Sequence, residues 1–305
     1  MSSYATSLKH GLLLMCLARV AAAQDLEPRR WSHVPAGAQF AGVAYAYTHA
    51  NITFDPVLEV EDVTLDLHTA AVKYTYAFEL LDRLARVDVL APYQDAQWEG
   101  LLRGEPAVRQ HTGFADPSAR FAVNLVGSPP LKGPAFAEYQ AAHPVQNIVG
   151  AAFAVQAPLG QYYEDKLLNL GENRYVLRPE LGAVHVHGKW SAELTGSISY
   201  FTDNEEFFND TTREQDPLFV IQGHVVYTFR PGFWVSGGVG SGTGGESFIS
   251  DVAKDDEKKN VAMGISAGYP INRNVGVKLG YLKTETHTAT GSDSDTFVSA
   301  MSVMW

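Results

Sequence analysis

Charged and polar side chains occupy alternate positions within otherwise apolar segments, so they share one face of any extended chain. The members of this set that could do chemistry are Lys73, Arg86, Asp88, Arg120, Arg174, Arg178, Glu180, Glu193, Gln222, His224 and Lys278. Rings of charge select solutes in channels. The same charges can instead pair with one another and close the space between them, and Arg178, Glu180 and Glu193 are the expected pairing group.

A hydrolytic site is the first alternative. A serine hydrolase needs a serine, a histidine and an acid or amide that meet in space. His287, Ser292 and Ser294 lie close together in the sequence, but they form no recognisable motif. We therefore expect that this protein is not an enzyme, and a lipid hydrolase is the least favoured function.

Cofactor and metal sites are not expected either. The run from Gly240 to Gly245 matches GxGxxG, but no helical pattern follows it, so it fails the context of a dinucleotide site. His185 and His187 share a strand face without further ligands. The acidic stretch 203–210 lacks the spacing of a calcium loop and is expected to be solvated.

The start of the chain has the composition of a secretory signal peptide. Lys9 precedes an apolar run, and three alanines end at Ala23, so residues 1–23 are the predicted signal with cleavage before Gln24. Cys16 lies within it, so the mature chain would contain no cysteine for disulfides or thiol catalysis. The formal net charge of -11 disfavours nucleic-acid binding.

The alternation has a period of two residues, which predicts that these side chains lie on β-strands. The clearest example is Lys189–Tyr200, where Trp190, Leu194 and Ile198 fall on one face and Glu193 falls on the other. About twelve segments share this pattern and have the length of a membrane strand: Phe40–Tyr47, Val72–Leu80, Ala85–Ala91, Ala119–Val126, Ile148–Ala157, Arg174–His185, Lys189–Tyr200, Leu218–Arg230, Gly232–Gly240, Asn260–Tyr269, Val275–Lys283 and Ser294–Trp305.

These segments predict an all-β fold, a transmembrane antiparallel up-and-down β-barrel of about twelve strands, over residues 24–305. Aromatic residues gather at the strand ends, as in the girdles of outer-membrane barrels. A soluble barrel would show the same alternation with its faces reversed. The last strand ends on Trp305, which predicts recognition by the barrel-assembly machinery.

The connections between these segments alternate in length. Long ones, predicted to be extracellular, cover residues 48–67, 92–117, 158–173, 202–216 and 241–259. Short ones are predicted to be periplasmic. The exception is 127–146, which we expect to be a periplasmic insert with a helical turn at Ala135–Ala142.

Several stretches carry a family resemblance: Arg29–His33, Phe54–Leu58, Asp165–Gly171, Asn173-Arg174, Glu193–Ser197 and Arg213–Leu218. They resemble the outer-membrane family named for the meta-pathway of phenol degradation. The resemblance implies a transporter in the outer membrane. It does not identify the solute, because fold-level analogy does not give function.

Together these features predict an outer-membrane channel for passive passage of small apolar or aromatic molecules. Its partners would be outer-membrane lipid and the small-molecule solute. The alternative is a structural or adhesive barrel that transports nothing, with a lumen closed by salt bridges.

Overall fold

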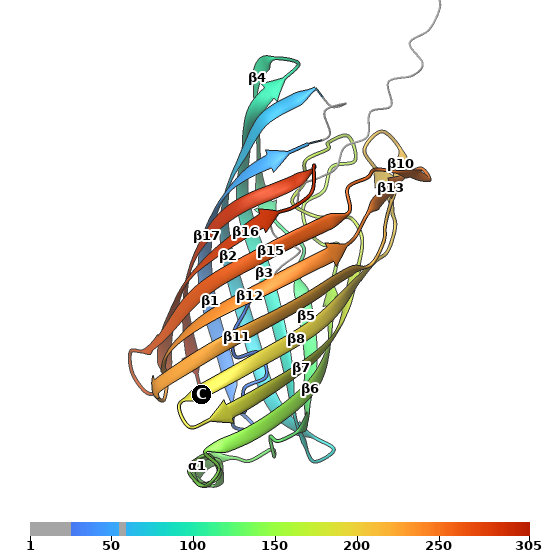
Figure 1. The fold of residues 1–305 in the computed structure, drawn as a ribbon. Coiled ribbons are helices and arrows are strands. Elements are labelled where there is room, and N and C mark those ends of the chain that lie inside the picture. The colour runs from blue at the N-terminus through green and yellow to red at the C-terminus, as the bar shows by residue number, and fades with distance from the viewer. Residues whose placement is uncertain (1–25, 55–58) are drawn as a thin grey trace, which may run out of the picture.

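The structure is a computed structural model that describes residues 26–54 and 59–305. Twelve antiparallel strands close into a barrel (Figure 1), which confirms the predicted fold. They are β1 (Gln39–Thr53), β2 (Val60–Leu80), β3 (Arg83–Leu102), β5 (Ser118–Val126), β6 (Val145–Gln156), β7 (Val176–His187), β8 (Trp190–Phe201), β11 (Leu218–Arg230), β12 (Phe233–Gly244), β15 (Lys258–Pro270), β16 (Val275–Thr286) and β17 (Gly291–Met304).

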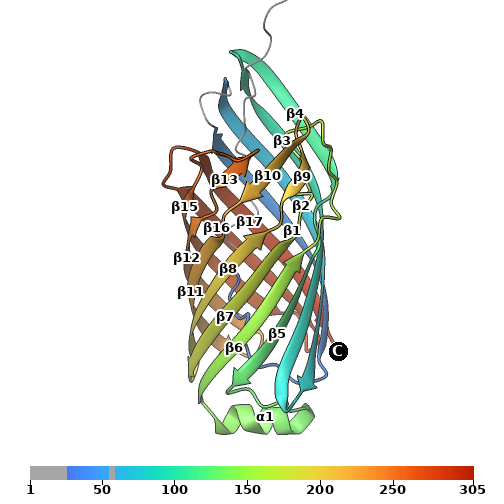
Figure 2. The same cartoon turned by 90° about the vertical axis from the view of Figure 1, so that its right-hand side faces the viewer.

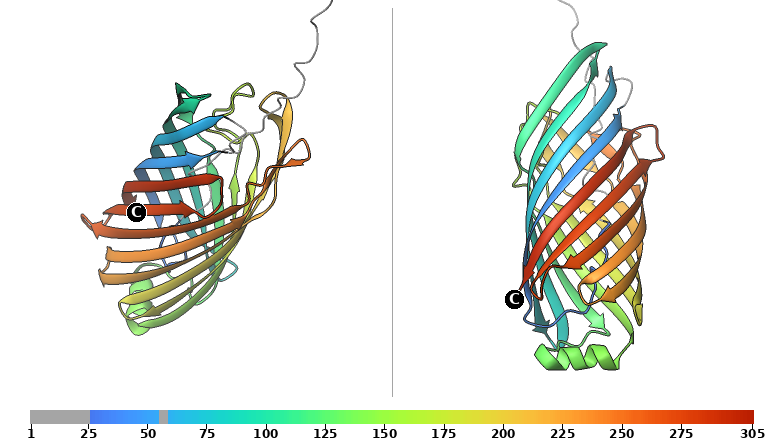
Figure 3. Two further views of the ribbon diagram at one scale, coloured as in Figure 1. Left: turned by 45° about the horizontal axis from the view of Figure 1, so that its top comes forward. Right: turned by 90° about the vertical axis from the view of Figure 1, so that its left-hand side faces the viewer.

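The first and last strands form the seam of the barrel. β1 pairs with β17 from Phe40↔Met304 to Thr53↔Gly291. At one end Gln39 and Trp305 exchange two backbone hydrogen bonds of 3.0 and 3.1 Å. The chain end therefore lies beside the start of β1, at the end of the barrel that carries the short turns (Figure 3).

The large apolar side chains face outward. Val43, Trp190, Phe219 and Leu279 each expose more than half of their surface, whereas Glu193 is buried on the opposite face of β8. This phase matches a lipid-facing exterior and a polar interior, and it contradicts the soluble-barrel alternative.

Two of the predicted long loops are largely strand, because β1 and β2 cover most of residues 48–67, and β3 and a further strand cover most of residues 92–117. β3 runs on to Leu102 and turns into β4 (Glu105–Phe114), so residues 92–117 form a hairpin that extends the wall. Pro92 does not interrupt β3, although a proline lacks the amide hydrogen. Its carbonyl accepts from the backbone of Ala115 at 3.1 Å, so the missing donor faces the short break between β4 and β5, where no ladder bond is needed.

Two other connections build a small second sheet beyond the barrel. It contains β9 (Asn204–Phe207), β10 (Thr211–Gln215), β13 (Ser247–Ile249) and β14 (Val252–Ala253). The helix α1 (Gly133–Ala142) lies at the opposite end, in the connection between β5 and β6, and overlaps the predicted helical turn (Figure 2). Within the described ranges, no helix combines the length and apolar character needed to span a membrane.

Candidate functional site: the barrel lumen

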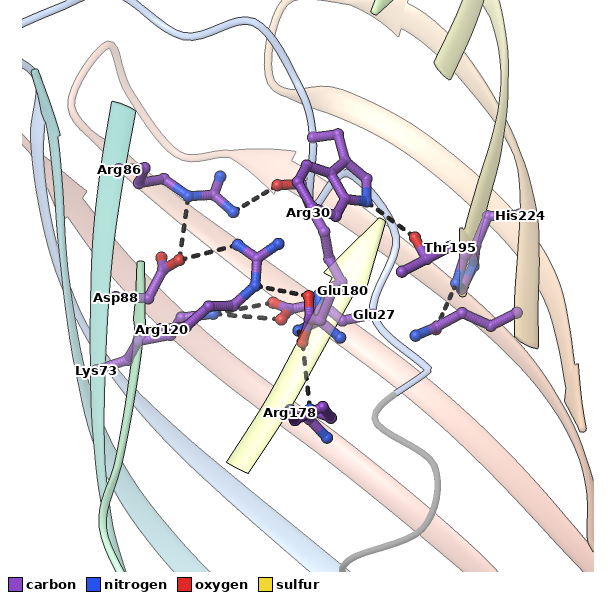
Figure 4. Close-up of polar contacts among 12 residues, drawn as sticks. Glu27, Arg30, Lys73, Arg86, Asp88, Arg120, Arg178, Glu180, Thr195 and His224 are labelled. Atoms are coloured by element: carbon purple, nitrogen blue, oxygen red, sulfur yellow. Dashed lines mark hydrogen bonds and ion pairs between the residues drawn. The ribbon is translucent and has the colours of Figure 1, made fainter. Parts of the chain in front are cut away.

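A segment that precedes β1 lies inside the barrel. We call residues 26–34 the N-terminal plug; in Figure 4 two of them, Glu27 and Arg30, meet charged side chains of the wall. Arg30 and Trp31 are buried, and Trp31 exposes only 1% of its surface. After the plug the chain returns to the short-turn end, where Gly37 donates to the backbone carbonyl of Ala77 at 2.7 Å. The lumen is therefore filled by a separate segment rather than by wall side chains alone.

Glu180 on β7 is the centre of the strongest charge cluster. Its side chain is 1% exposed and meets three guanidinium groups (Figure 4). Arg30 of the plug lies 3.1 Å away, Arg120 on β5 lies 2.9 Å away, and Arg178 on β7 lies 3.2 Å away. A carboxylate so buried needs such partners, because an unpaired buried charge is costly. One plug cation thus shares its carboxylate with two wall cations.

A second carboxylate extends this cluster towards β3. Asp88 pairs with Arg86 at 3.1 Å and with Arg120 at 3.4 Å, and it accepts from the Thr75 hydroxyl at 2.7 Å. The Arg86 guanidinium also donates to the backbone carbonyl of Arg30. The plug backbone as well as its side chains is therefore held by the wall.

Two further residues, Glu27 and Arg29, hold the beginning of the plug. Glu27 lies 3.2 Å from the ammonium of Lys73 and 3.8 Å from that of Lys278. The backbone N–H of Arg29 donates to Glu193 on β8 at 2.6 Å, and the Arg29 guanidinium lies over the ring of Trp234 at 5.5 Å. These contacts spread the attachment over opposite walls of the barrel.

Trp31 is fixed by a fitted socket. Its indole N–H donates to the Thr195 hydroxyl at 2.9 Å, and the Arg120 guanidinium lies 4.7 Å from its ring centre. Gly150 on β6 and Gly182 on β7 lie directly against the indole, and a Cβ added at either position would overlap it. The socket therefore requires glycine at two wall positions.

The plug is also linked to α1 through His33. The ring nitrogen Nε2 lies 2.8 Å from the carbonyl of Pro129, and Gln140 on α1 donates to Nδ1 at 3.0 Å. Phe136 and Tyr139 of the same helix meet the imidazole edge-on at 4.9 and 5.4 Å. A neutral ring that carries its hydrogen on Nε2 satisfies both hydrogen bonds.

The structure brings together most of the predicted lumen residues, but not all. Gln222 and His224 on β11 bond to each other at 3.3 Å and are buried. Arg174 does not join the plug cluster: it lies just before β7 at the long-loop end, 2.9 Å from Glu172 and stacked on the Phe201 ring at 4.5 Å. It therefore belongs to the network that anchors the long loops.

Within the described residues, the fold does not assemble the candidate catalytic side chains or a metal-binding group. Ser292 and Ser294 are buried on β17, and in the described part of the chain no hydrogen bond joins them to the His287 side chain. Across residues 26–54 and 59–305, no group of three or more His, Cys, Asp or Glu side chains is arranged to hold a metal ion.

The plug was not predicted from the sequence. Its residues show no alternation and belong to no strand, and only the family resemblance of Arg29–His33 distinguished them. The available signal was two arginines and a tryptophan that follow the predicted cleavage site after five residues.

Comparison with known proteins agrees with this architecture. The chain is similar to the COG4313 outer membrane channel from Pseudomonas putida F1, with 21% identity, a TM-score of 0.75, and coverage of 92% of this chain and 100% of that one. It also resembles the transport unit of the autotransporter AIDA-I from Escherichia coli, with 11% identity, a TM-score of 0.52, and coverage of 94% and 95%. Both likenesses concern the fold. A search of curated proteins gives no match.

A family model is more specific than either structure. The model described as "Putative MetA-pathway of phenol degradation" matches residues 50–298, which is most of the chain. The matched range includes every barrel strand in whole or in part, while the plug precedes it. The chain belongs to this family.

Proposed function

We propose that the protein is an outer-membrane channel for passive passage of small apolar or aromatic molecules, and that the N-terminal plug closes it at rest. The observation that supports this most directly is the plug itself. A lumen filled by a terminal segment can be emptied by moving that segment, whereas a lumen filled by wall side chains cannot. Family membership and the likeness to a channel fold point the same way.

The predicted lumen residues take a specific role in this proposal. Arg86, Asp88, Arg120, Arg178, Glu180 and Glu193, with Lys73 and Lys278, are the seat of the plug, and they line the path once it leaves. Because the seat carries charge of both signs, we expect weak selectivity between cations and anions.

The second candidate is a barrel that transports nothing. The buried ion pairs around Glu180 favour it, because they close the lumen as it stands. The two candidates differ in whether the full chain, with its plug present, passes a solute.

Single-channel recording and liposome swelling separate them. We compare the mature chain with a variant that lacks residues 26–34, both refolded into lipid, with one apolar and one polar solute. The channel proposal expects low conductance for the full chain and a clear rise for the variant. It also expects the full chain to pass the apolar solute. If the full chain passes no solute, the non-transporting barrel is the better description.

We also propose the route to the membrane. Residues 1–23 act as a cleaved signal, 24–305 form the barrel unit, 127–146 form a periplasmic insert, and the strand ending at Trp305 engages the assembly machinery of a Gram-negative outer membrane. N-terminal sequencing of the protein from purified outer membranes tests the cleavage before Gln24. Removal of Trp305 should lower the amount assembled, measured by heat-modifiable migration on gels.

A further inference from the structure

The inner wall changes character at its long-loop end. Steps of two residues from Lys73 on β2 and from Asp88 on β3 pass one hydrogen-bonded polar pair, Thr69 and Gln94, and then reach inward side chains that are apolar. Together with β1 they form one buried cluster, which we call the apolar shelf: Ala50, Ile52, Phe54, Val63, Leu65, Leu67, Ala96 and Trp98. The shelf contains no charged side chain, and it lies on the part of β1–β3 that continues beyond the charged seat of the plug.

Two leucines from a loop of a neighbouring part of the barrel cover the shelf. Leu168 and Leu170, in the connection between β6 and β7, pack against it and are partly buried there. Figure 1 shows this connection folded over the barrel mouth near β4. The shelf is thus not a finished core between two sheets. It is an apolar wall covered by a loop.

The tip of this loop is residues 163–170, and its hydrogen bonds stay within the loop. In the part of the chain that the structure describes, Asn169 bonds to the backbone of Tyr163 and of Lys166, and Lys166 bonds to Tyr163 and Asp165. None of these bonds reaches the shelf. The tip can therefore leave the shelf without leaving a buried polar group unpaired, which is the expensive part of most rearrangements.

The base of the loop is fixed, in contrast to its tip. Asp116 accepts from the backbone N–H of Gly160 at 2.9 Å and from that of Glu172 at 2.7 Å, so both ends of the loop meet one carboxylate. Gln161 adds a backbone bond to Phe114 at 2.7 Å. Movement is therefore confined to the residues that carry the two leucines.

We propose that the apolar shelf is the first binding site for the solute, an uncharged hydrocarbon, which binds by displacing Leu168 and Leu170. This inference rests on the proposed function and adds to it a location and a competitor. The side chains of Leu168 and Leu170 are aliphatic, so we expect the shelf to accept aliphatic groups of this size. An apolar solute of similar size restores the burial that their departure removes. The shelf side chains themselves offer no partner for a charged group, and the nearest ionisable neighbours are Arg109 and His111 of β4 at its edge.

Trp98 gives a direct measurement, because it is part of the shelf. We use the full chain in lipid nanodiscs and titrate 1-bromohexane, whose heavy atom quenches a nearby indole. Trp190 and Trp305 face lipid and report probe dissolved in the membrane. The difference between the protein and Trp98→Phe isolates the shelf signal, which we expect to saturate.

The leucines are tested in the same assay. In L168A/L170A the competitor is weakened, so we expect the quenching midpoint to fall by about 3- to 10-fold, the factor by which a covered site weakens apparent binding. The matched control is Leu159→Ala, because Leu159 lies in the same connection but is 72% exposed and is not part of the shelf contact. Its midpoint should stay at the wild-type value.

The outcomes separate this inference from the channel proposal. Quenching of Trp98 that does not saturate, or a midpoint in L168A/L170A equal to wild type, overturns the shelf as a binding site even if solute flux is observed. Saturable quenching with the expected shift supports the shelf. If the same protein reconstituted into liposomes then shows no flux, it is the channel proposal that fails.

Discussion

Glu180 on β7 and Arg30 of the N-terminal plug form an ion pair of 3.1 Å, although they lie 150 residues apart in the sequence. Neither side chain reaches solvent to any extent, with exposures of 1% and 6%. The pair joins the plug, which lies in the lumen and is not part of the barrel wall, to the middle of that wall. The plug is therefore held mainly where the charges are least screened.

Replacing Glu180 by glutamine should release the plug. Arg30, Arg120 and Arg178 would then face a neutral amide, and breaking a buried ion pair from one side costs about 3–5 kcal/mol. We expect longer or more frequent conducting events in single-channel recordings. Glu285→Gln is the control, since Glu285 is half-exposed on β16 and pairs only with nearby Lys283 among the described ion pairs. A closed E180Q channel would mean that other contacts hold the plug.

Gly182→Ala should displace Trp31 from its socket. The added methyl group would overlap the indole, and the loss of a well-packed tryptophan costs about 3–5 kcal/mol. We expect increased conductance and a rise in amide exchange over residues 28–33, measured by mass spectrometry. Gly196→Ala on β8 provides the comparison, because no atom lies within 4 Å of a Cβ placed there. Equal behaviour of the two variants would contradict the socket.

The contact between the plug and α1 should weaken in acid. Burial lowers the pKa of His33 below its ordinary value of 6.5, although its hydrogen bond to Pro129 opposes this. A released His33 therefore binds a proton more readily than a docked one, so docking is fully favoured above about pH 6.5 and is lost progressively as the pH falls below it.

Amide exchange in α1, measured between pH 5 and 8 and corrected for the intrinsic rate, checks this. Protection should fall towards pH 5 in the wild type, and His33→Gln should flatten the dependence. His187→Gln, at an exposed turn of the same barrel end, should keep it. If the pH dependence of protection in α1 persists in H33Q, a titratable group other than His33 causes it.

Asp116→Asn should loosen the loop that covers the apolar shelf. Hydrogen bonds to a charged acceptor contribute about 1.5–3 kcal/mol each, and Asp116 binds the backbone at both ends of that loop. Residues 158–173 should exchange faster while the barrel strands keep their protection. Asp95→Asn is the matched change, because Asp95 accepts from Gln110 and Thr112 on the exposed face. Unchanged amide exchange in D116N would show that Asp116 does not hold this loop in place.

The membrane-facing half of the fold follows from the sequence for a simple reason. Lipid and lumen impose opposite polarity on alternate residues, so Phe219 and Leu279 could be assigned outward and Glu180 inward without coordinates. The same rule gave the strand count. It says only on which side a residue lies, so it could not show that Glu180 binds Arg30.

The features that the sequence did not predict are those to which the alternation of polarity does not apply. At the long-loop end the outer face of β2 and β3 carries polar residues such as Asp66 and Asp95 in place of aliphatic ones, so these strand segments looked like loops. Pro92 strengthened that impression. Arg174 has the lumen phase but lies past the strand end, where phase no longer determines a neighbour. The plug has no periodicity at all, and only its partners define it.

The position of Trp31 in the chain has a consequence for biogenesis. Trp31 precedes β1, yet its socket consists of residues from β6, β7 and β8, the most distant of which, Thr195, lies 164 residues later in the sequence. Contacts so distant in sequence are slow to form. Each newly inserted molecule should therefore pass through an interval without its plug. A cell that makes this protein quickly would carry a transient population of leaky precursors.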